Sequence, residues 1–280
     1  MIILLCWIIL TIADLTVSGL LKLIFGLPFK KAFLWGLLAL LLPPIIIAYG
    51  SLIERNCFRI KEITIKTTAL PESFDGYRIV HISDIHARSF NGREKQLQRA
   101  MDMINELKPD MVAFTGDLIT MTPDELESHT HALGSLKARD GIFSVLGNHD
   151  YSMYSDATPE ARQKHMETLI SAEEALGWDL LIDENRIIRR GTDSIAVIGV
   201  QNTSPSRHFP SKGNLNMASE GTEGMFRILL SHDPMHWEAE ILGQNYPLTL
   251  SGHTHAMQFS FLGWSPSSLM FKQFRGLYTK

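Results

Sequence analysis

The first 53 residues are almost entirely apolar, whereas the rest of the chain alternates short apolar runs with polar segments. Residues 2–27 form one apolar stretch, interrupted by Asp14 and Lys22, and residues 32–53 form a second without a charged side chain. A helix needs about 20 apolar residues to cross the hydrocarbon core of a bilayer. The pattern therefore predicts a transmembrane anchor over residues 1–56, with spans at about 2–27 and 32–53.

Basic residues lie near the turn of this predicted hairpin, at Lys22, Lys30 and Lys31, and also after its second span, at Arg55, Arg59 and Lys61. The positive-inside rule therefore gives opposing signals and leaves the side of the following domain undetermined. We expect a multi-pass membrane protein.

From residue 57 onward the pattern is that of an α/β domain, expected over residues 57–280. Apolar runs that predict strands occur at 79–83, 111–115, 142–146, 226–231 and 248–251. Helical spacing occurs at 93–107, 123–136, 159–176 and 235–242. Alternation at 60–66 predicts a further strand, and three closely spaced runs between 180 and 200 predict an antiparallel part.

Composition excludes one class of partner. The chain has 280 residues, a net charge of −4 and a sequence pI near 6.3. Proteins that bind nucleic-acid backbones usually carry a strong basic excess. We therefore expect no nucleic-acid partner, and the composition does not predict the oligomeric state.

Five of the predicted strands each end in a short polar cluster. The clusters are Asp84-Ile85-His86, Gly116-Asp117, Gly147-Asn148-His149-Asp150, His232-Asp233 and Gly252-His253-Thr254-His255. In open α/β sheets, ligands bind beyond the carboxyl ends of the strands. If these strands lie side by side, the five clusters meet at one edge, and the three glycines fit tight turns where backbones approach closely.

The clusters supply seven side chains that can ligate a metal: Asp84, His86, Asp117, Asn148, His232, His253 and His255. None is a thiolate, and oxygen with imidazole ligands suits Mn²⁺, Fe or Zn²⁺, of which we favour Mn²⁺. Seven ligands are too many for one ion and fit two ions that share a carboxylate. Two such ions clamp a phosphorus centre and hold a bridging hydroxide that attacks it.

The ordered set Asp-x-His, Gly-Asp, Gly-Asn-His-Asp, His and Gly-His-x-His strongly resembles the calcineurin-like metallophosphoesterases, over roughly residues 60–261. The resemblance implies a four-layer α/β/β/α sandwich of two mixed sheets. It assigns Asp84, His86 and His255 to one metal, Asn148, His232 and His253 to the other, and Asp117 to a bridge between them. It also implies that His149 protonates the leaving oxygen or steadies the phosphate.

The apolar head and the stretch from Gly76 to His86 look most like the bacterial membrane-anchored branch. This resemblance implies location in a bacterial inner membrane. Some members of that branch act on UDP-2,3-diacylglucosamine. We therefore expect a phosphohydrolase or phosphodiesterase for a lipid-linked phosphate ester or pyrophosphate. An anchored enzyme for soluble nucleotides, and an inactive metal-binding membrane module, are the alternatives.

Two further features bear on this expectation. Ala256-Met257-Gln258 stand where many relatives have Gly-Gly-Gln, and relatives usually continue further, so we expect truncation at the C-terminus. The long polar segment 201–224 carries Arg207, His208 and Lys212, which are candidates for binding a substrate phosphate. A solvated loop is the equal alternative for that segment.

Overall fold

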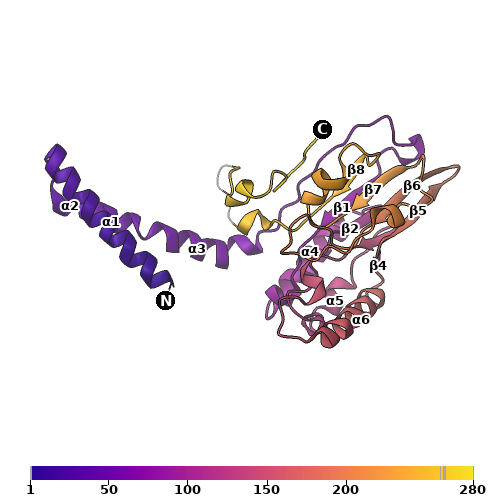
Figure 1. The fold of residues 1–280 in the computed structure, drawn as a ribbon, viewed down its shortest axis with the longest axis horizontal. Coiled ribbons are helices and arrows are strands. Elements are labelled where there is room, and N and C mark those ends of the chain that lie inside the picture. The colour runs from indigo at the N-terminus through magenta and orange to yellow at the C-terminus, as the bar shows by residue number, and fades with distance from the viewer. Residues whose placement is uncertain (1, 259, 261–262, 280) are drawn as a thin grey trace. The chain divides into compact units, whose positions relative to one another are not determined.

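The protein is described from a computed structural model that defines residues 2–258, 260 and 263–279. The chain divides into two compact units, Met1–Ile63 and Thr64–Lys280. The first unit is helical, and the second contains both sheets (Figure 1).

The first unit consists of α1 (Ile2–Phe25), α2 (Phe29–Ala39) and α3 (Leu42–Leu52). Helices α1 and α2 form a hairpin, in which the carboxylate of Asp14 lies where a side chain at Gly36 would stand. The hydroxyl of Ser18 donates to Asp14 Oδ1 over 3.3 Å. The small residue at position 36 is therefore what lets the two helices approach at this point.

The second predicted span is interrupted rather than continuous. Helix α2 ends at Ala39, and α3 begins at Leu42 with proline in its first turn. Proline lacks an amide hydrogen, so it fits the start of a helix but not its interior. Each piece has 11 residues, which rise about 16 Å where a bilayer core needs about 30 Å.

Across the described part of the chain, no helix has both the length and the apolarity that membrane crossing requires. This finding differs from the prediction of two spans.

Each sheet of the second unit has four strands. The first sheet runs β1 (Ile79–Ile82), β2 (Met111–Phe114), β3 (Gly141–Ser144) and β4 (Asp179–Leu180), all parallel. The second runs β5 (Glu184–Arg190), β6 (Asp193–Gly199), β7 (Phe226–Leu230) and β8 (Leu248–Leu250). In the second sheet β5 is antiparallel to β6, and the other pairs are parallel.

The prediction of two mixed sheets is therefore right for the second sheet and wrong for the first. Strand β4, which we expected in the antiparallel part, joins the first sheet beside β3. The chain between them passes through helix α6 (Pro159–Ala175), and such a crossover brings the second strand back parallel. Strands β5 and β6 are joined by the two-residue turn Gly191-Thr192, which makes them antiparallel.

Four layers result, in the predicted α/β/β/α order (Figure 1). Side chains of β2 alternate: Val112 and Phe114 pack toward the helices, whereas Met111 and Ala113 pack toward the second sheet. The helices on the first sheet are α4 (Glu94–Glu106), α5 (Thr130–Leu133) and α6. The outer face of the second sheet is covered by α7 (Leu215–Ala218) and a single π-helical turn, Trp237–Ile241.

Several predicted elements differ in detail. Residues 60–66, all of them described, are not paired in a sheet, and Ile60, Ile63 and Ile65 leave 56%, 44% and 47% of their surface exposed. An alternating pattern stabilises a strand only where one face is buried, and this one has no such face. The predicted helix at 123–136 is likewise shorter, with a 3-10 turn at Pro123–Leu126 followed by α5.

Candidate metal centre

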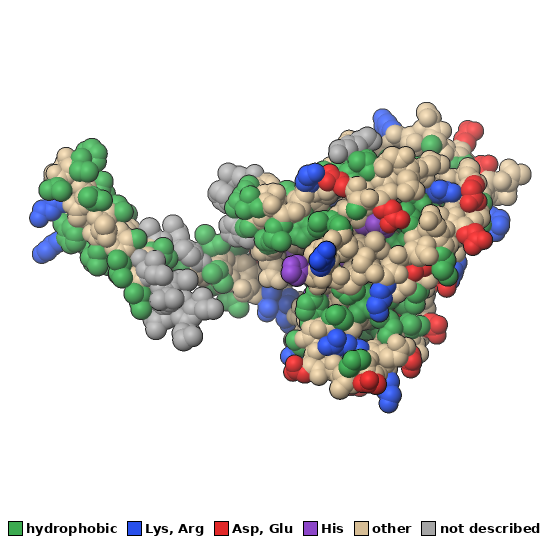
Figure 2. Space-filling model, in the orientation of Figure 1, with side chains coloured by type: hydrophobic (Ala, Val, Ile, Leu, Met, Phe, Trp, Pro, Cys, Tyr) green, Lys and Arg blue, Asp and Glu red, His purple; other side chains and the backbone are tan. Residues whose placement is uncertain are grey.

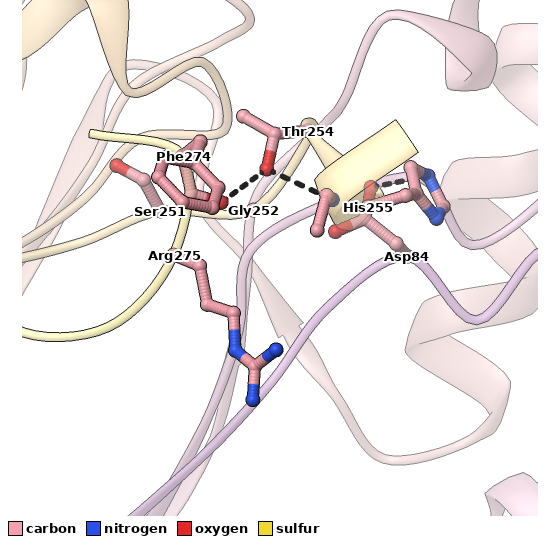
Figure 3. Close-up of a pocket in the computed structure, with 8 residues that line it drawn as sticks. Asp84, Ser251, Gly252, Thr254, His255, Phe274 and Arg275 are labelled. Carbon is pink, nitrogen blue, oxygen red and sulfur yellow. Dashed lines mark hydrogen bonds and ion pairs between the residues drawn. The ribbon is translucent and has the colours of Figure 1, made fainter. Parts of the chain in front are cut away.

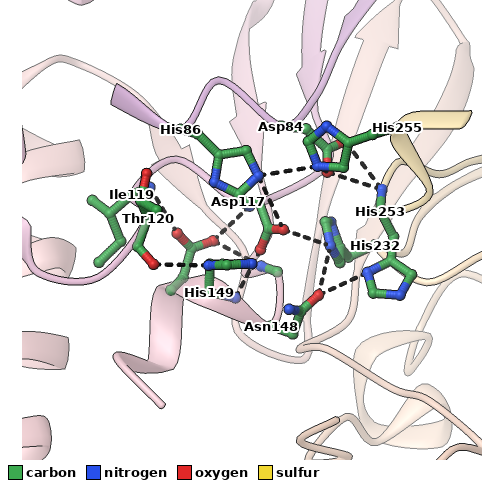
Figure 4. A network of polar contacts seen from close by, with 12 residues as sticks. Asp84, His86, Asp117, Ile119, Thr120, Asn148, His149, His232, His253 and His255 are labelled. Carbon is green, nitrogen blue, oxygen red and sulfur yellow. Dashed lines mark hydrogen bonds and ion pairs between the residues drawn. The ribbon is translucent and has the colours of Figure 1, made fainter. Parts of the chain in front are cut away.

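The five polar clusters meet beyond the ends of strands from both sheets (Figure 4). Backbone hydrogen bonds join their loops within each sheet, from Asp84 N to Gly116 O at 2.9 Å and from Gly252 N to His232 O at 2.9 Å. The amide of His253 donates to the carboxylate of Asp84 over 3.0 Å, which ties the second sheet to the first. The predicted meeting at one edge is thus what the structure contains, although two sheets contribute to it.

Backbone conformation turns many of these side chains toward one centre. Five of the candidate ligands adopt positive φ, between 45° and 74°: Asp84, His86, Asp117, His253 and His255. This region is costly for residues other than glycine and is found mostly where function requires it. The concentration of left-handed residues at one site supports a functional role for the site.

The three predicted glycines allow the loops to touch. A Cβ added at Gly147 would lie 2.5 Å from the amide nitrogen of Asp117 and would also collide with its carboxylate. A Cβ at Gly116 would meet the backbone of Gly147, and one at Gly252 would meet Ser83 and Asp84. Close approach of backbones at this site therefore depends on glycine at all three positions.

One group of side chains comprises Asp84, His86, Asp117 and His255, each with a potential ligand atom within 4.8 Å of the others. His255 Nε2 lies 3.0 Å from Asp84 Oδ1 and 3.1 Å from His86 Nε2. His86 Nε2 is also 3.6 Å from Asp117 Oδ2. Two imidazole nitrogens and two carboxylates thus surround one point.

A second group comprises Asp117, His232 and His253. His232 Nε2 lies 3.2 Å from Asp117 Oδ2 and 3.1 Å from Asn148 Oδ1, and His253 Nδ1 lies 2.7 Å from that same amide oxygen. Among the described residues, Asp117 is the one that belongs to both groups. The structure therefore brings all seven predicted side chains together in two adjoining sets (Figure 4).

The charges of the centre favour a cation. Burial alone would raise the pKa of Asp84, but the hydrogen bond from His255 and the nearby His232 hold that pKa well below its ordinary value. Burial alone would lower the pKa of His232, yet the Asp117 carboxylate raises it to about 10. A fully buried imidazole thus retains a proton because two ionised carboxylates attract positive charge. Nitrogen and oxygen donors around this charge fit divalent metal ions.

His149 lies beside the centre and is in neither metal-competent group among the described residues. Its Nδ1 is 2.7 Å from the carbonyl oxygen of Thr120, which can only accept, so this nitrogen carries a proton. Its amide donates to Asp117 Oδ1 over 2.8 Å, and its ring meets that of His86 edge-on with centroids 4.7 Å apart. Among the described residues, no hydrogen bond is found to the other ring nitrogen, Nε2, which can therefore exchange a proton with a bound molecule.

The polar segment 201–224 reaches the centre through an aromatic side chain. Phe209 meets the ring of His253 edge-on with centroids 4.6 Å apart. The neighbouring Arg207 and His208 are exposed, and Lys212 places its ammonium 4.6 Å from the ring centroid of Tyr151. The roles predicted for these three basic residues in phosphate binding therefore stay predictions.

A pocket of about 360 Å³ adjoins the centre. Asp84 and His255 line one side, and Phe274 and Arg275 line another (Figure 3). The hydroxyl of Thr254, between the two histidines of the last motif, donates to the carbonyl oxygen of Phe274 over 2.6 Å. The segment that carries Arg275 is thereby tied directly to the candidate ligand loop.

Three residues with clear contacts at the centre are not among the predicted ligands or the predicted acid: Asp150, Tyr154 and Phe209. The buried carboxylate of Asp150 accepts from the amides of Asp117, Leu118 and Gly147 at 2.8, 2.9 and 2.8 Å, and so joins two loops. Its place in the Gly-Asn-His-Asp motif is the sequence signal for such an orienting role. Tyr154 and Phe209 carry no such signal, because they lie in loops outside the five motifs.

The chain is similar in sequence to known proteins. Residues 77–257 match the family model described as calcineurin-like phosphoesterase. A transmembrane protein with metallophosphoesterase domain from Danio rerio is 34% identical over 230 residues, which are 79% of this chain and 50% of that protein. The uncharacterized metallophosphoesterase YkuE of Bacillus subtilis is 30% identical over 223 residues, 78% of this chain and 72% of that protein.

A third relative has a named substrate. The UDP-2,3-diacylglucosamine pyrophosphatase LpxG of Chlamydia trachomatis is 27% identical over 262 residues, 76% of this chain and 73% of that protein. The chain therefore spans half the length of the Danio rerio relative and nearly three quarters of each of the two bacterial ones.

Proposed function

The chain belongs to the calcineurin-like phosphoesterases. We propose that it is a metal-dependent phosphoester hydrolase that works with two divalent ions held by the seven clustered side chains. Asp84, His86 and His255 would hold one ion, Asn148, His232 and His253 would hold the other, and Asp117 would contribute its carboxylate to both. The observation that carries this proposal is the buried carboxylate of Asp117, which belongs to both metal-competent groups. Mn²⁺ is the ion that we favour, with Fe and Zn²⁺ as alternatives that suit the same donors.

Besides holding the ions, the protein side chains donate a proton and position the ligand loops. When bound, two such ions supply positive charge for the phosphate oxygens and a nucleophile at neutral pH. His149 acts as the acid: the Thr120 carbonyl holds its Nδ1 proton, and a second proton on Nε2 passes to the leaving oxygen. Asp150 holds the loops of Asp117 and Gly147 in place through their amides, which preserves the separation of the ligands.

Metal removal tests this proposal directly. The purified chain should hydrolyse a generic aryl phosphodiester with Mn²⁺, lose the activity after chelation, and regain it when Mn²⁺ is restored. Full activity in a metal-free preparation would refute the two-ion proposal. Tight binding of two ions without any hydrolysis would instead favour the inactive metal-binding module.

We propose a substrate that is a lipid-linked phosphate ester or pyrophosphate. LpxG, a relative over 76% of this chain, is named for a lipid-linked pyrophosphate, and the apolar helices α1–α3 supply a means of staying near lipid. Large apolar side chains on these helices are exposed, with Leu23, Trp35 and Leu52 leaving 82%, 72% and 68% of their surface uncovered. Figure 2 shows hydrophobic side chains on the drawn face of this helical unit.

Membrane association by the helical unit is part of this proposal, and two relatives, from Danio rerio and Bos taurus, are named transmembrane proteins. Holding an active site near a bilayer raises the effective concentration of substrates confined to that surface. The alternative, a soluble nucleotide substrate, has the same chemistry at phosphorus and no requirement for acyl chains.

Comparing kcat/KM for a lipid-linked pyrophosphate with that for its deacylated analogue distinguishes the two. A preference of at least about tenfold for the acylated substrate, roughly 1.4 kcal/mol, supports the lipid-linked proposal. Equal values support the soluble substrate. Arg207, His208 and Lys212 stay candidates for binding the substrate phosphate, and alanine variants of each should raise KM if they do so.

A further inference from the structure

Tyr154 contacts two residues of the proposed site although it belongs to none of the five motifs. Its hydroxyl accepts a hydrogen bond from Asn148 Nδ2 over 2.9 Å. Its ring stacks on the imidazole of His149, with centroids 4.2 Å apart and planes inclined by 27°. One side chain thus contacts both the single amide among the proposed ligands and the proposed acid.

The contact with Asn148 determines which end of the amide faces the metal centre. A carboxamide can ligate a cation through Oδ1 but not through its NH₂ group, which only donates. Oδ1 of Asn148 faces His232 and His253, at 3.1 and 2.7 Å, while Nδ2 faces Tyr154. The Asn148 side chain is almost fully buried, so removing the hydroxyl leaves a donor that solvent does not readily satisfy.

The contact with His149 restrains the imidazole from a second direction. The Thr120 carbonyl fixes the ring through Nδ1, and a hydrogen bond along one edge still allows rotation about that edge. The Tyr154 ring covers one face of the imidazole and limits that rotation. The imidazole is therefore held at a defined angle beside the proposed reaction centre.

We propose that Tyr154 is a positioning residue with two separable parts: its hydroxyl orients the Asn148 amide for metal binding, and its ring holds the His149 imidazole. This inference rests on the proposed two-ion function. Hydrogen-bond partners of metal ligands typically contribute 10- to 100-fold to metal affinity. The hydroxyl should accordingly affect one ion, and the ring should affect proton transfer.

Two substitutions separate these parts. Tyr154→Phe keeps the ring and removes the acceptor, so the ion held by Asn148 should bind about tenfold more weakly, while the other ion binds as before. Tyr154→Leu removes both parts, so at saturating metal kcat should fall further. That additional loss should be larger for an alkoxide leaving group than for a nitrophenolate, because only the former needs a proton.

Tyr246→Phe is the matched control. Its hydroxyl lies 2.7 Å from the hydroxyl of Ser219, and neither residue is among the proposed ligands. The substitution therefore removes a comparable hydrogen bond elsewhere in the same unit. Circular dichroism verifies that each variant is folded before metal is added.

Calorimetric titration of the metal-free full chain with Mn²⁺ measures the affinity of each ion. Weakened binding of one ion in Tyr154→Phe, with both affinities retained in Tyr246→Phe, supports the inference. Unchanged binding of both ions in Tyr154→Phe overturns it while leaving the two-ion proposal intact. Failure of the wild-type chain to bind two ions would overturn the proposed function and this inference together.

Discussion

Glu173 gives a stability prediction that can be worked out from its surroundings. Its side chain lies in α6, is fully buried, and accepts a hydrogen bond from the hydroxyl of Ser144 in β3. Burial raises the pKa of Glu173 to about 8, against an ordinary value of 4.5. The carboxyl group is therefore neutral in the folded protein at pH 7, whereas it is ionised in the unfolded chain.

The direction of the pH effect follows from proton binding. Between pH 4.5 and about 8 the folded state holds a proton that the unfolded state has released. The contribution of this proton binding to the free energy of unfolding is therefore complete below pH 4.5. It decreases as the pH rises above 4.5 and is lost as the pH passes through about 8. Each pKa unit corresponds to about 1.4 kcal/mol, so the total loss is on the order of 5 kcal/mol.

Glu173→Gln removes this titration while preserving shape, because the amide oxygen still accepts from Ser144. The free energy of unfolding of the variant should depend less on pH, and the variant should exceed the wild type in stability at pH 8.5. Urea unfolding followed by circular dichroism between pH 5 and 9 measures both. Glu174→Gln, at the exposed neighbouring position on the same helix, is the control.

The difference between variant and wild type is the informative quantity, because titrations at the metal centre are largely common to both; the exception is Asp150, whose charge contributes to the raised pKa of Glu173. If the stability curves of Glu173→Gln and the wild type run parallel across this pH range, the buried carboxyl group is not neutral in the folded state. That result would refute the reasoning.

Three further predictions concern the centre. Asp117→Asn should lower the metal content, measured by elemental analysis, and abolish hydrolysis in a phosphodiester assay, because both ions lose a charged ligand. A variant with two ions and normal kcat would contradict the bridging role. His149→Ala should lower kcat about 10²- to 10⁴-fold at normal metal content, with a smaller loss for a nitrophenolate leaving group; an equal loss for all leaving groups would indicate phosphate positioning instead. Gly147→Ala should destabilise the fold by about 1–3 kcal/mol in thermal unfolding and weaken metal binding, because the added methyl group collides with Asp117; an unchanged melting temperature would show that the loops can separate at no cost.

Local sequence patterns were sufficient for much of the second unit. Strand β2 was predicted because its apolar residues are continuous, and it is continuous because Met111 faces the second sheet while Val112 faces the helices. Helices α4 and α6 were predicted within one residue at both ends of each helix, since their apolar spacing and flanking Pro or Gly are local features. The candidate ligands were identified because metal binding needs particular side chains directly after strands.

Tertiary structure decided what depends on distant partners. Strand β4 joined β3 rather than its sequence neighbour β5, because the preceding helix returns the chain parallel to the first sheet. Residues 60–66 have the alternation of a strand but no sheet face to cover, so the pattern by itself was not enough.

The centre itself shows the same division. Sequence determined which side chains could bind a metal, since ligand chemistry belongs to the residue type. Only the fold decided that the amide of His253 would meet Asp84 across 169 positions, and that Tyr154 would hold Asn148 and His149. Contacts of this kind follow from the packing of two sheets face to face, and packing is a property of the whole chain that no local pattern contains.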